Sequence, residues 1–193
     1  DIIASAKTIC KRYKGNQAHA EYLEQMAGKF FDLLQKYHGL GERERLLLRL
    51  AAILHDCGKF ISMSAPGECA YQIIMSTEIL GISHMEREMV ASIVRYNTME
   101  LPNFNEFDGK LGNDEYLIVM KLAAILRVCN ALDRSHRQKF ADMKLTIKDS
   151  NIVITTAYPD NITLEKKTLQ DKQDFFEEVY GLGFEIKQKK KKQ

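Results

Sequence analysis

The sequence lacks several features that would point directly to a partner or a compartment. Its 193 residues carry a formal net charge of only +2, which gives no general preference for nucleic acid. No signal peptide and no apolar run of bilayer length is present, so we expect no membrane partner. The four cysteines form no C-x-x-C pair, and Cys57 and Cys129 lie in apolar stretches. We therefore expect free, buried thiols in a reducing, cytoplasmic environment.

The length and composition fit one sizeable globular domain, or one domain with a small appendage. Hydrophobic residues make up 45% of the chain and charged residues 28%, which are ordinary values for a folded protein. The sequence begins with Asp1 rather than methionine, so we expect it to be part of a longer protein. It ends in a lysine-rich stretch, residues 188–193, which we expect to be a solvated, disordered tail.

The most informative stretch is an apolar run that leads from Arg45 directly into His55 and Asp56. A run that is apolar on every side is typical of a buried helix, and Gly58 is a suitable residue to end it. The pattern therefore places a histidine and a carboxylate at the buried end of a core helix. A buried carboxylate is costly unless a metal, a basic side chain or a protonated histidine meets it, so the rest of the chain should supply a partner.

Two further polar residues are predicted to point inward from core helices. His19 shares the apolar face of a helix over residues 17–37, and Asp133 continues the buried row of a second long apolar helix. Considered alone, His19 is most simply a core histidine bonded to a carbonyl, and Asp133 could pair with a nearby arginine. Together with His55 and Asp56 they form a reasonable site for Mn, Fe, Zn or Mg. A water on such a cation could be activated to attack a phosphoester.

The pattern changes beyond residue 140, from helical periodicity to short alternating runs rich in Ile, Val and Thr. These runs predict a hairpin over 144–148 and 151–156, a further strand over 162–165, an amphipathic helix over 168–180 and a last strand over 184–186. The fold class we expect is mostly α, with a helical domain followed by a small α+β subdomain. The expected divisions are 1–141 for the helical domain, 142–187 for the subdomain and 188–193 for the tail.

Three stretches resemble the C-terminal half of the exopolyphosphatase / guanosine-pentaphosphate phosphohydrolase (Ppx/GppA) family. They are Leu-Ala-Ala-Ile-Leu-His-Asp-Cys-Gly-Lys-Phe-Ile-Ser at 50–62, Ile-Val-Arg-Tyr at 93–96 and Leu-Ala-Ala-Ile-Leu-Arg-Val-Cys-Asn-Ala-Leu-Asp-Arg-Ser-His at 122–136. The order His, His-Asp, Asp also resembles the HD superfamily of metal-dependent phosphohydrolases. The resemblance covers nearly the whole chain, and it implies an HD-domain-like helical bundle ahead of the α+β part.

The resemblance also implies a division of labour within a longer protein. Family members hydrolyse the terminal phosphate of polyphosphate, or the 5′ phosphate of guanosine pentaphosphate, with Mg. Their catalytic residues lie in an N-terminal actin-like ATPase-type domain, whose Gly-rich phosphate loops are not found in this sequence. We therefore assign no catalytic residue here, leave open whether this chain is itself an enzyme, and expect it to bind polyphosphate and to form a homodimer.

The residues expected to serve these roles fall into two groups. Those that would hold a divalent metal at the HD-like site are His19, His55, Asp56 and Asp133. Those that would bind phosphate or polyphosphate through a positive charge are Lys59, Arg95, Arg127, Arg134 and Arg137.

The sequence departs from the family pattern at two places, and two other interpretations stay open. A His-rich run of the family is replaced by residues 65–68, and the usual Arg-Tyr-His is Arg95-Tyr96-Asn97. One alternative is a stand-alone metal-dependent HD phosphohydrolase that acts on nucleotide phosphates. The other is a structural remnant in which His55 and Asp56 only hydrogen-bond to Asp133 or a neighbouring arginine.

Overall fold

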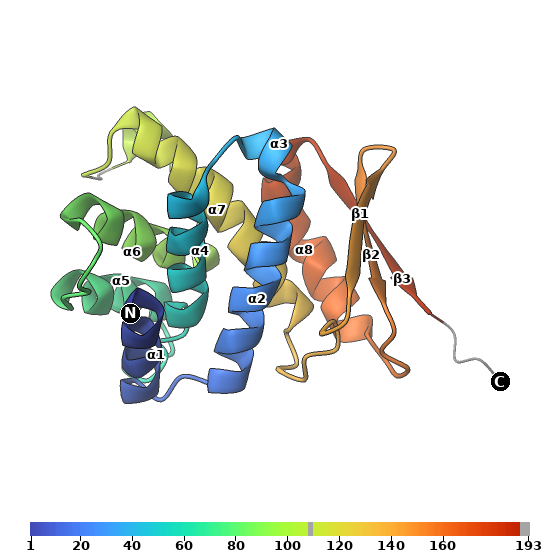
Figure 1. The fold of residues 1–193 in the computed structure, drawn as a ribbon, viewed down its shortest axis with the longest axis horizontal. Helices are drawn as coiled ribbons and strands as arrows, with labels where there is room; N and C mark the ends of the chain where they lie inside the picture. Colours follow the sequence, from blue (N-terminus) through green and yellow to red (C-terminus); the bar gives the residue numbers. More distant parts are fainter. Residues whose placement is uncertain (108–109, 190–193) are drawn as a thin grey trace.

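Helices form most of the chain, and a small sheet stands at its C-terminal end (Figure 1), as the sequence predicted. The computed structural model describes residues 1–107 and 110–189. Most of the expected disordered tail, residues 190–193, lies outside them. The helices and strands are α1 (Ile2–Arg12), α2 (Gln17–Leu33), α3 (Gln35–His38), α4 (Glu42–Leu54), α5 (Pro66–Ser76), α6 (His84–Thr98), η1 (Phe104–Glu106), α7 (Asn113–Leu132), β1 (Lys144–Lys148), β2 (Asn151–Thr156), α8 (Thr163–Tyr180) and β3 (Gly183–Gln188).

Helix α4 is central to the helical part and contacts α1, α2, α6 and α7. Its C-terminal half is apolar on nearly every side, and Leu48, Leu50, Ala51 and Ala52 have no exposed surface. Because two of these are alanines, neighbouring helices can approach its axis closely while it still buries apolar area on several faces. The prediction of a buried helix ahead of His55 is therefore confirmed.

The end of α4 differs from the prediction that Gly58 stops it. The helix ends at Leu54 with His55 as its C-cap, and residues 55–61 form successive turns. Gly58 is needed for a different reason, because a Cβ there would lie 2.0 Å from the carbonyl oxygen of Pro66 and 2.6 Å from the nitrogen of Ala70. The backbone of these turns lies directly against the start of α5, so a side chain at this position is sterically excluded.

The C-terminal sheet has the strand order β1-β2-β3. The predicted hairpin is confirmed, with Asp149 and Ser150 at positive φ (50° and 60°) between antiparallel β1 and β2, as tight hairpin turns require. Strand β3 pairs in parallel with β2 after the chain has crossed through α8, which packs on α7. The C-terminal α+β part therefore packs on the bundle mainly through α8 against α7, and β1 also contacts α2.

The predicted strand over residues 162–165 is wrong. Ile162 is the N-cap of α8, and the following residues form its first turn. The Asn161 side chain accepts a hydrogen bond from the Thr163 backbone N–H at 2.7 Å, which helps to begin a helix. Four alternating residues are too few to separate a strand from a helix start when such a capping side chain precedes them.

Two simpler expectations can also be compared with the structure. All four cysteines are free, and Cys57 and Cys129 are buried as predicted. Among the described residues, no helix has both the length and the apolar character that a bilayer crossing needs.

Lowering the pH is expected to destabilise the fold through His38, which is buried at the end of α3. Its Nε2–H donates to the Phe31 carbonyl and its Nδ1 accepts from the Leu40 N–H, both at 2.9 Å, so only the neutral ring satisfies both contacts. Burial lowers the pKa of His38. Below about pH 6.5 the unfolded chain therefore takes up the proton first, and the free energy of unfolding falls as the pH drops.

Urea unfolding at about pH 7.5 and about pH 5.5 tests this expectation. The His38→Gln variant keeps a donor and an acceptor but cannot titrate, so it should lose less stability between the two pH values than the wild type. Equal losses in the two proteins would contradict the assignment.

Candidate metal centre

Three helix ends bring the four predicted polar residues together at the lower side of the view in Figure 1, where α2 begins and α4 and α7 end. His19 lies in the first turn of α2, His55 and Asp56 follow α4, and Asp133 caps α7. His19 Nδ1 is 2.6 Å from Asp133 Oδ2, and His19 Nε2 is 3.0 Å from His55 Nε2. Asp133 is fully buried, so the prediction that it points inward is confirmed.

The imidazole rings of His19 and His55 face each other through their Nε2 atoms. His55 Nδ1 donates to the Ala52 carbonyl at 2.6 Å, and His19 Nδ1 donates to the Asp133 carboxylate. In the neutral rings both Nε2 atoms then carry a lone pair, and they stand 3.0 Å apart. Two such lone pairs repel unless a proton or a cation lies with them.

Asp56 adds a carboxylate to this pair of nitrogens. Its oxygens lie 3.3 Å from His55 Nε2 and 3.9 Å from His19 Nε2, and one ligand atom from each of the three residues falls within 4.8 Å of the others. Two imidazole nitrogens and a carboxylate oxygen are a donor set that suits a divalent transition metal. The three residues therefore fit a metal ion.

Asp133 contacts the Nδ1 side of the His19 ring, whereas the Nε2 side of that ring faces His55. Its Oδ1 accepts from the Gln138 backbone N–H at 2.8 Å, and its Oδ2 accepts from His19 and from Gln138 Nε2 at 3.2 Å. Both carboxylate oxygens are thus engaged by protein donors. This geometry favours Asp133 as the group that fixes the ring orientation and tautomer of His19, and its expected role as a direct ligand stays a prediction.

Charge around Asp56 favours its ionised form. Burial raises the pKa of Asp56, but the charge and hydrogen bond of His55, and then Lys59, outweigh burial and hold that pKa well below its usual range. Lys59 Nζ is 2.8 Å from Asp56 Oδ1. Lys59, predicted to bind phosphate, therefore lies at the cluster with a partly exposed ammonium group.

The turn after α7 contributes residues that the sequence analysis did not assign to the site. The His136 ring stacks on His19 with centroids 3.8 Å apart and planes 14° apart, and burial followed by the charge of His19 lowers the pKa of His136. Asn130, in the last turn of α7 itself, places its Oδ1 3.2 Å from His19 Nε2. His136 stands in the stretch that carries the family resemblance, but helical periodicity cannot predict a side chain's direction in a turn with positive φ at His136 and Gln138.

The other predicted phosphate-binding residues separate into two groups. Arg134 and Arg137 are exposed in the same turn as His136, so they lie beside the cluster along the chain. Arg127 instead donates to the carbonyls of Tyr96 and Met99 at 2.8 and 2.6 Å. It is occupied in holding the segment after α6.

Arg95 is also held by the protein itself. Its Nη2 lies 2.7 Å from Glu68 Oε2, and its guanidinium stacks on the rings of Tyr71 and Tyr96. The structure therefore does not bring Arg95 and Arg127 to the histidine cluster as ready phosphate contacts.

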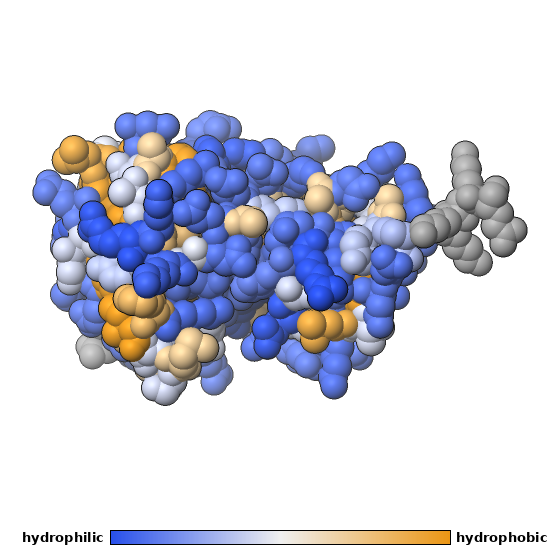
Figure 2. All heavy atoms as spheres, turned by 90° about the horizontal axis from the view of Figure 1, so that it is seen from below, coloured by the Kyte–Doolittle hydropathy of each residue, from blue (hydrophilic) through white to orange (hydrophobic). Residues whose placement is uncertain are grey.

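The face of the molecule at this end is mainly hydrophilic. Figure 2 views the molecule from below, and hydrophobic patches are concentrated toward the side on which α1 and α5 lie. Exposed apolar side chains in the segment between α4 and α5 are Phe60, Ile61 and Met63. The rest of this face is mostly hydrophilic with smaller apolar patches (Figure 2), so a charged ligand could approach it.

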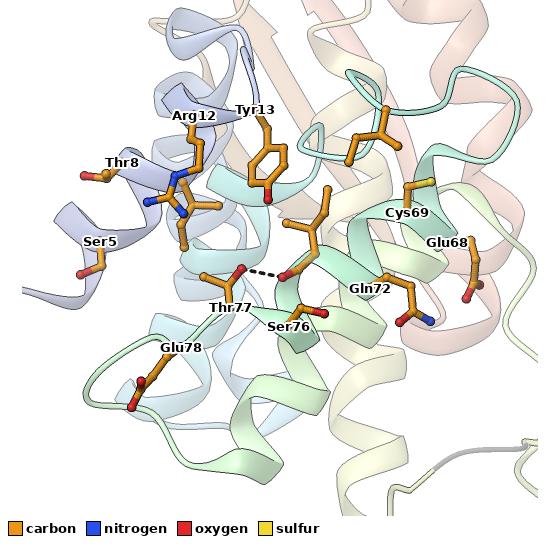
Figure 3. Close-up of a pocket in the computed structure, with 13 residues that line it drawn as sticks. Ser5, Thr8, Arg12, Tyr13, Glu68, Cys69, Gln72, Ser76, Thr77 and Glu78 are labelled. Atoms are coloured by element: carbon orange, nitrogen blue, oxygen red, sulfur yellow. Dashed lines mark hydrogen bonds between the residues drawn. The ribbon is translucent and has the colours of Figure 1, made fainter.

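A groove of about 820 Å³ lies between α1 and α5 (Figure 3), and it shares no residue with the histidine cluster. Arg12 and Tyr13 reach into it from α1, and Gln72 lines it from α5. Two of its residues, Glu68 and Glu78, are acidic. These carboxylates make the groove less suitable for a polyanion than the surroundings of Lys59.

Comparison with known proteins gives one clear result. Residues 3–174 match the family described as Ppx/GppA phosphatase, domain III. The match includes all four residues of the predicted metal site. A search of curated proteins found no match.

Proposed function

This chain belongs to the Ppx/GppA phosphatase family, and on that premise we propose that it holds a divalent cation and binds the phosphate chain of the substrate beside it. In the full-length protein this role would serve hydrolysis of the terminal phosphate of polyphosphate or of guanosine pentaphosphate. The observation that carries the proposal is the approach of two imidazole Nε2 atoms to 3.0 Å while both Nδ1 atoms are tied to acceptors.

His19, His55 and Asp56 would hold the cation. Two nitrogens and one carboxylate suit Mn, Fe or Zn better than Mg, which prefers oxygen ligands; Mg is the metal expected of the full-length enzyme. When bound, the cation would supply positive charge against phosphate oxygens. Asp133 would keep the Nδ1–H tautomer of His19 in place, so that its Nε2 lone pair stays directed at the ion.

Basic side chains next to the cluster would contact the phosphate chain. Lys59 already points at the cluster, and Arg134 and Arg137 are exposed in the turn that follows Asp133. Guanidinium groups suit phosphate because they can donate two parallel hydrogen bonds. We expect these three residues to bind polyphosphate, with Arg95 and Arg127 keeping structural roles.

Neutralising the basic residues should weaken polyphosphate binding. The triple variant Lys59→Gln, Arg134→Gln, Arg137→Gln is expected to bind polyphosphate about tenfold more weakly or worse, because three charge-assisted contacts are lost. Isothermal titration calorimetry of the purified chain with polyphosphate, at two salt concentrations, measures the change.

A matched control removes the same charge at the other end of the molecule. Lys29, Lys36 and Lys148 are exposed on α2, α3 and the hairpin, and their replacement by glutamine should leave binding nearly unchanged. Equal weakening in both triple variants would mean that only overall charge matters, and the site assignment would fail.

The alternative is a stand-alone phosphohydrolase that acts on nucleotide phosphates. The same two imidazoles and Asp56 favour it, since that donor set is also one on which hydrolytic metal sites are built. Phosphate release from nucleotides by the purified chain with Mn²⁺, lost in His55→Ala, would support this function. Polyphosphate binding without turnover would support the first proposal. We also propose that the chain forms the homodimer that the family resemblance implies, which analytical ultracentrifugation would test.

A further inference from the structure

A small cavity of about 160 Å³ lies beside α5 and α6, away from the metal cluster and sharing no residue with it. The segment that follows α6 lines it with Glu106 and Phe107. Glu88 of α6 is the buried charge on its wall, with only 2% of its surface exposed.

Glu88 has unused hydrogen-bonding capacity in this cavity. Its Oε1 accepts from the Tyr71 hydroxyl, whereas its buried Oε2 has no hydrogen-bond partner among residues 1–107 and 110–189. Burial, and then the hydrogen bond to Glu88, raises the pKa of Tyr71, so the phenol remains a donor. A buried carboxylate oxygen without a donor is costly, and a group with N–H or O–H donors would relieve that cost.

Negative charge is in excess around the cavity. Arg95 is on the wall, but its guanidinium is paired with Glu68 at 2.7 Å. No ion pair of Glu88 or Glu106 is found within the part of the chain that the structure describes. Two carboxylates without a matching cation favour a positively charged ligand over a neutral or anionic one.

The remaining walls are aromatic. Tyr71, Tyr96 and Phe107 line the cavity, and the rings of Tyr96 and Phe107 have centroids 5.8 Å apart. The Arg95 guanidinium already lies 4.9 Å from the Tyr71 ring centroid and 5.6 Å from that of Tyr96, which shows that these rings can be approached by a cation. Aromatic faces next to a carboxylate are a common means of recognising organic ammonium groups.

One further group narrows the chemistry of the ligand. Arg95 Nε is buried and has no acceptor among the described residues. An ammonium group alone could satisfy Glu88 but would offer nothing to this N–H. A ligand with both an ammonium group and a hydroxyl oxygen could satisfy the two unpartnered groups together.

We propose that this cavity is a binding site for small amino alcohols, compounds that carry a primary ammonium group and a hydroxyl on a short carbon chain. The ammonium group donates to Glu88 Oε2, and the hydroxyl oxygen accepts from Arg95 Nε. The site is separate from the metal cluster and does not depend on the function proposed for it.

Three probes of similar size separate the contributions. Ethanolamine carries both groups, ethylamine carries only the ammonium group, and ethylene glycol carries only hydroxyls. Titrations followed by amide chemical shifts should show ethanolamine binding with shifts at Tyr71 and Ser92, ethylamine binding more weakly and ethylene glycol not binding. Ethylene glycol binding as well as ethanolamine would show a polar, water-filled cavity and would overturn the proposal.

Variants place the binding at this cavity. Glu88→Gln keeps the shape of the side chain and should weaken ethanolamine binding at least about tenfold, whereas Asp142→Asn, which removes an exposed carboxylate elsewhere, should not. Glu106→Gln, an exposed position at the cavity, should weaken it by a smaller factor and tests the site if Glu88→Gln does not fold. Unchanged affinity in the folded Glu variants, or shifts centred elsewhere, would overturn the proposal.

Discussion

Replacing Asp133 with asparagine is expected to weaken Mn²⁺ binding by about tenfold to a hundredfold, although Asp133 need not touch the metal. Its carboxylate holds the Nδ1–H of His19 at 2.6 Å and so keeps the Nε2 lone pair directed at His55 and Asp56. An asparagine in this place is neutral and brings an N–H₂ group toward the Gln138 donors that now bind Asp133. Calorimetric titration of the metal-free chain with Mn²⁺ measures the loss.

The comparison that separates an orienting role from direct ligation uses Asp56→Asn. Removal of a ligand should cost more affinity than removal of the group behind a ligand, so Asp56→Asn should bind Mn²⁺ more weakly than Asp133→Asn. Equal losses would make Asp133 a direct ligand. If Asp133→Asn lowers only the free energy of unfolding and the wild type binds no metal, the cluster is a structural hydrogen-bond network.

Breaking the buried ion pair between Lys139 and Glu165 is expected to destabilise the fold by about 3 kcal/mol. Glu165 is fully buried in the first turn of α8, and Lys139 Nζ lies 3.3 Å from its carboxylate. In Glu165→Gln the Lys139 ammonium would lose its counter-charge and keep only neutral acceptors, among them the Asn161 carbonyl at 2.8 Å, while it remained buried. Denaturant unfolding followed by far-UV circular dichroism measures the change.

Two further variants make this result interpretable. Lys166→Gln changes an exposed neighbour on the same helix and should alter the free energy of unfolding by less than about 0.5 kcal/mol. The double variant Lys139→Met, Glu165→Leu removes both charges and should recover most of the loss. A loss below about 1 kcal/mol in Glu165→Gln would show that the pair is better solvated than its burial indicates.

The parts of the fold that could be predicted from the sequence are those set by local periodicity. The apolar run before His55 could only be a buried helix, and alternating residues on both sides of Asp149-Ser150 could only form a hairpin. The start of α8 was missed because four alternating residues resemble a strand, and because the partner that allows Glu165 to be buried there, Lys139, comes from a distant part of the chain. The end of α4 was missed because the glycine at position 58 is required by the close approach of the Pro66 backbone and does not mark a helix C-terminus.

The candidate site also has features that could be predicted from the sequence and features that could not. Inward-facing positions on helices predicted that His19, His55, Asp56 and Asp133 would meet, and they do. Which of them would face a metal and which would orient another residue could not be predicted, because this depends on the hydrogen bonds that each oxygen and nitrogen makes across the bundle. The stacking of His136 on His19 depends on a turn with positive φ, for which helical spacing gives no signal.

The parallel pairing of β3 with β2 has a consequence for the order in which this protein can assemble. While the chain is being synthesised, β1 and β2 can pair as soon as both have emerged, but β3 cannot join until α8 has been completed and has crossed beside α7. A nascent chain that stops before Gly183 therefore presents β2 with an open hydrogen-bonding edge. A two-stranded ribbon of this kind is marginally stable by itself. Pairing of β3 with β2 should therefore prevent the newly synthesised chain from pairing with other chains through β2.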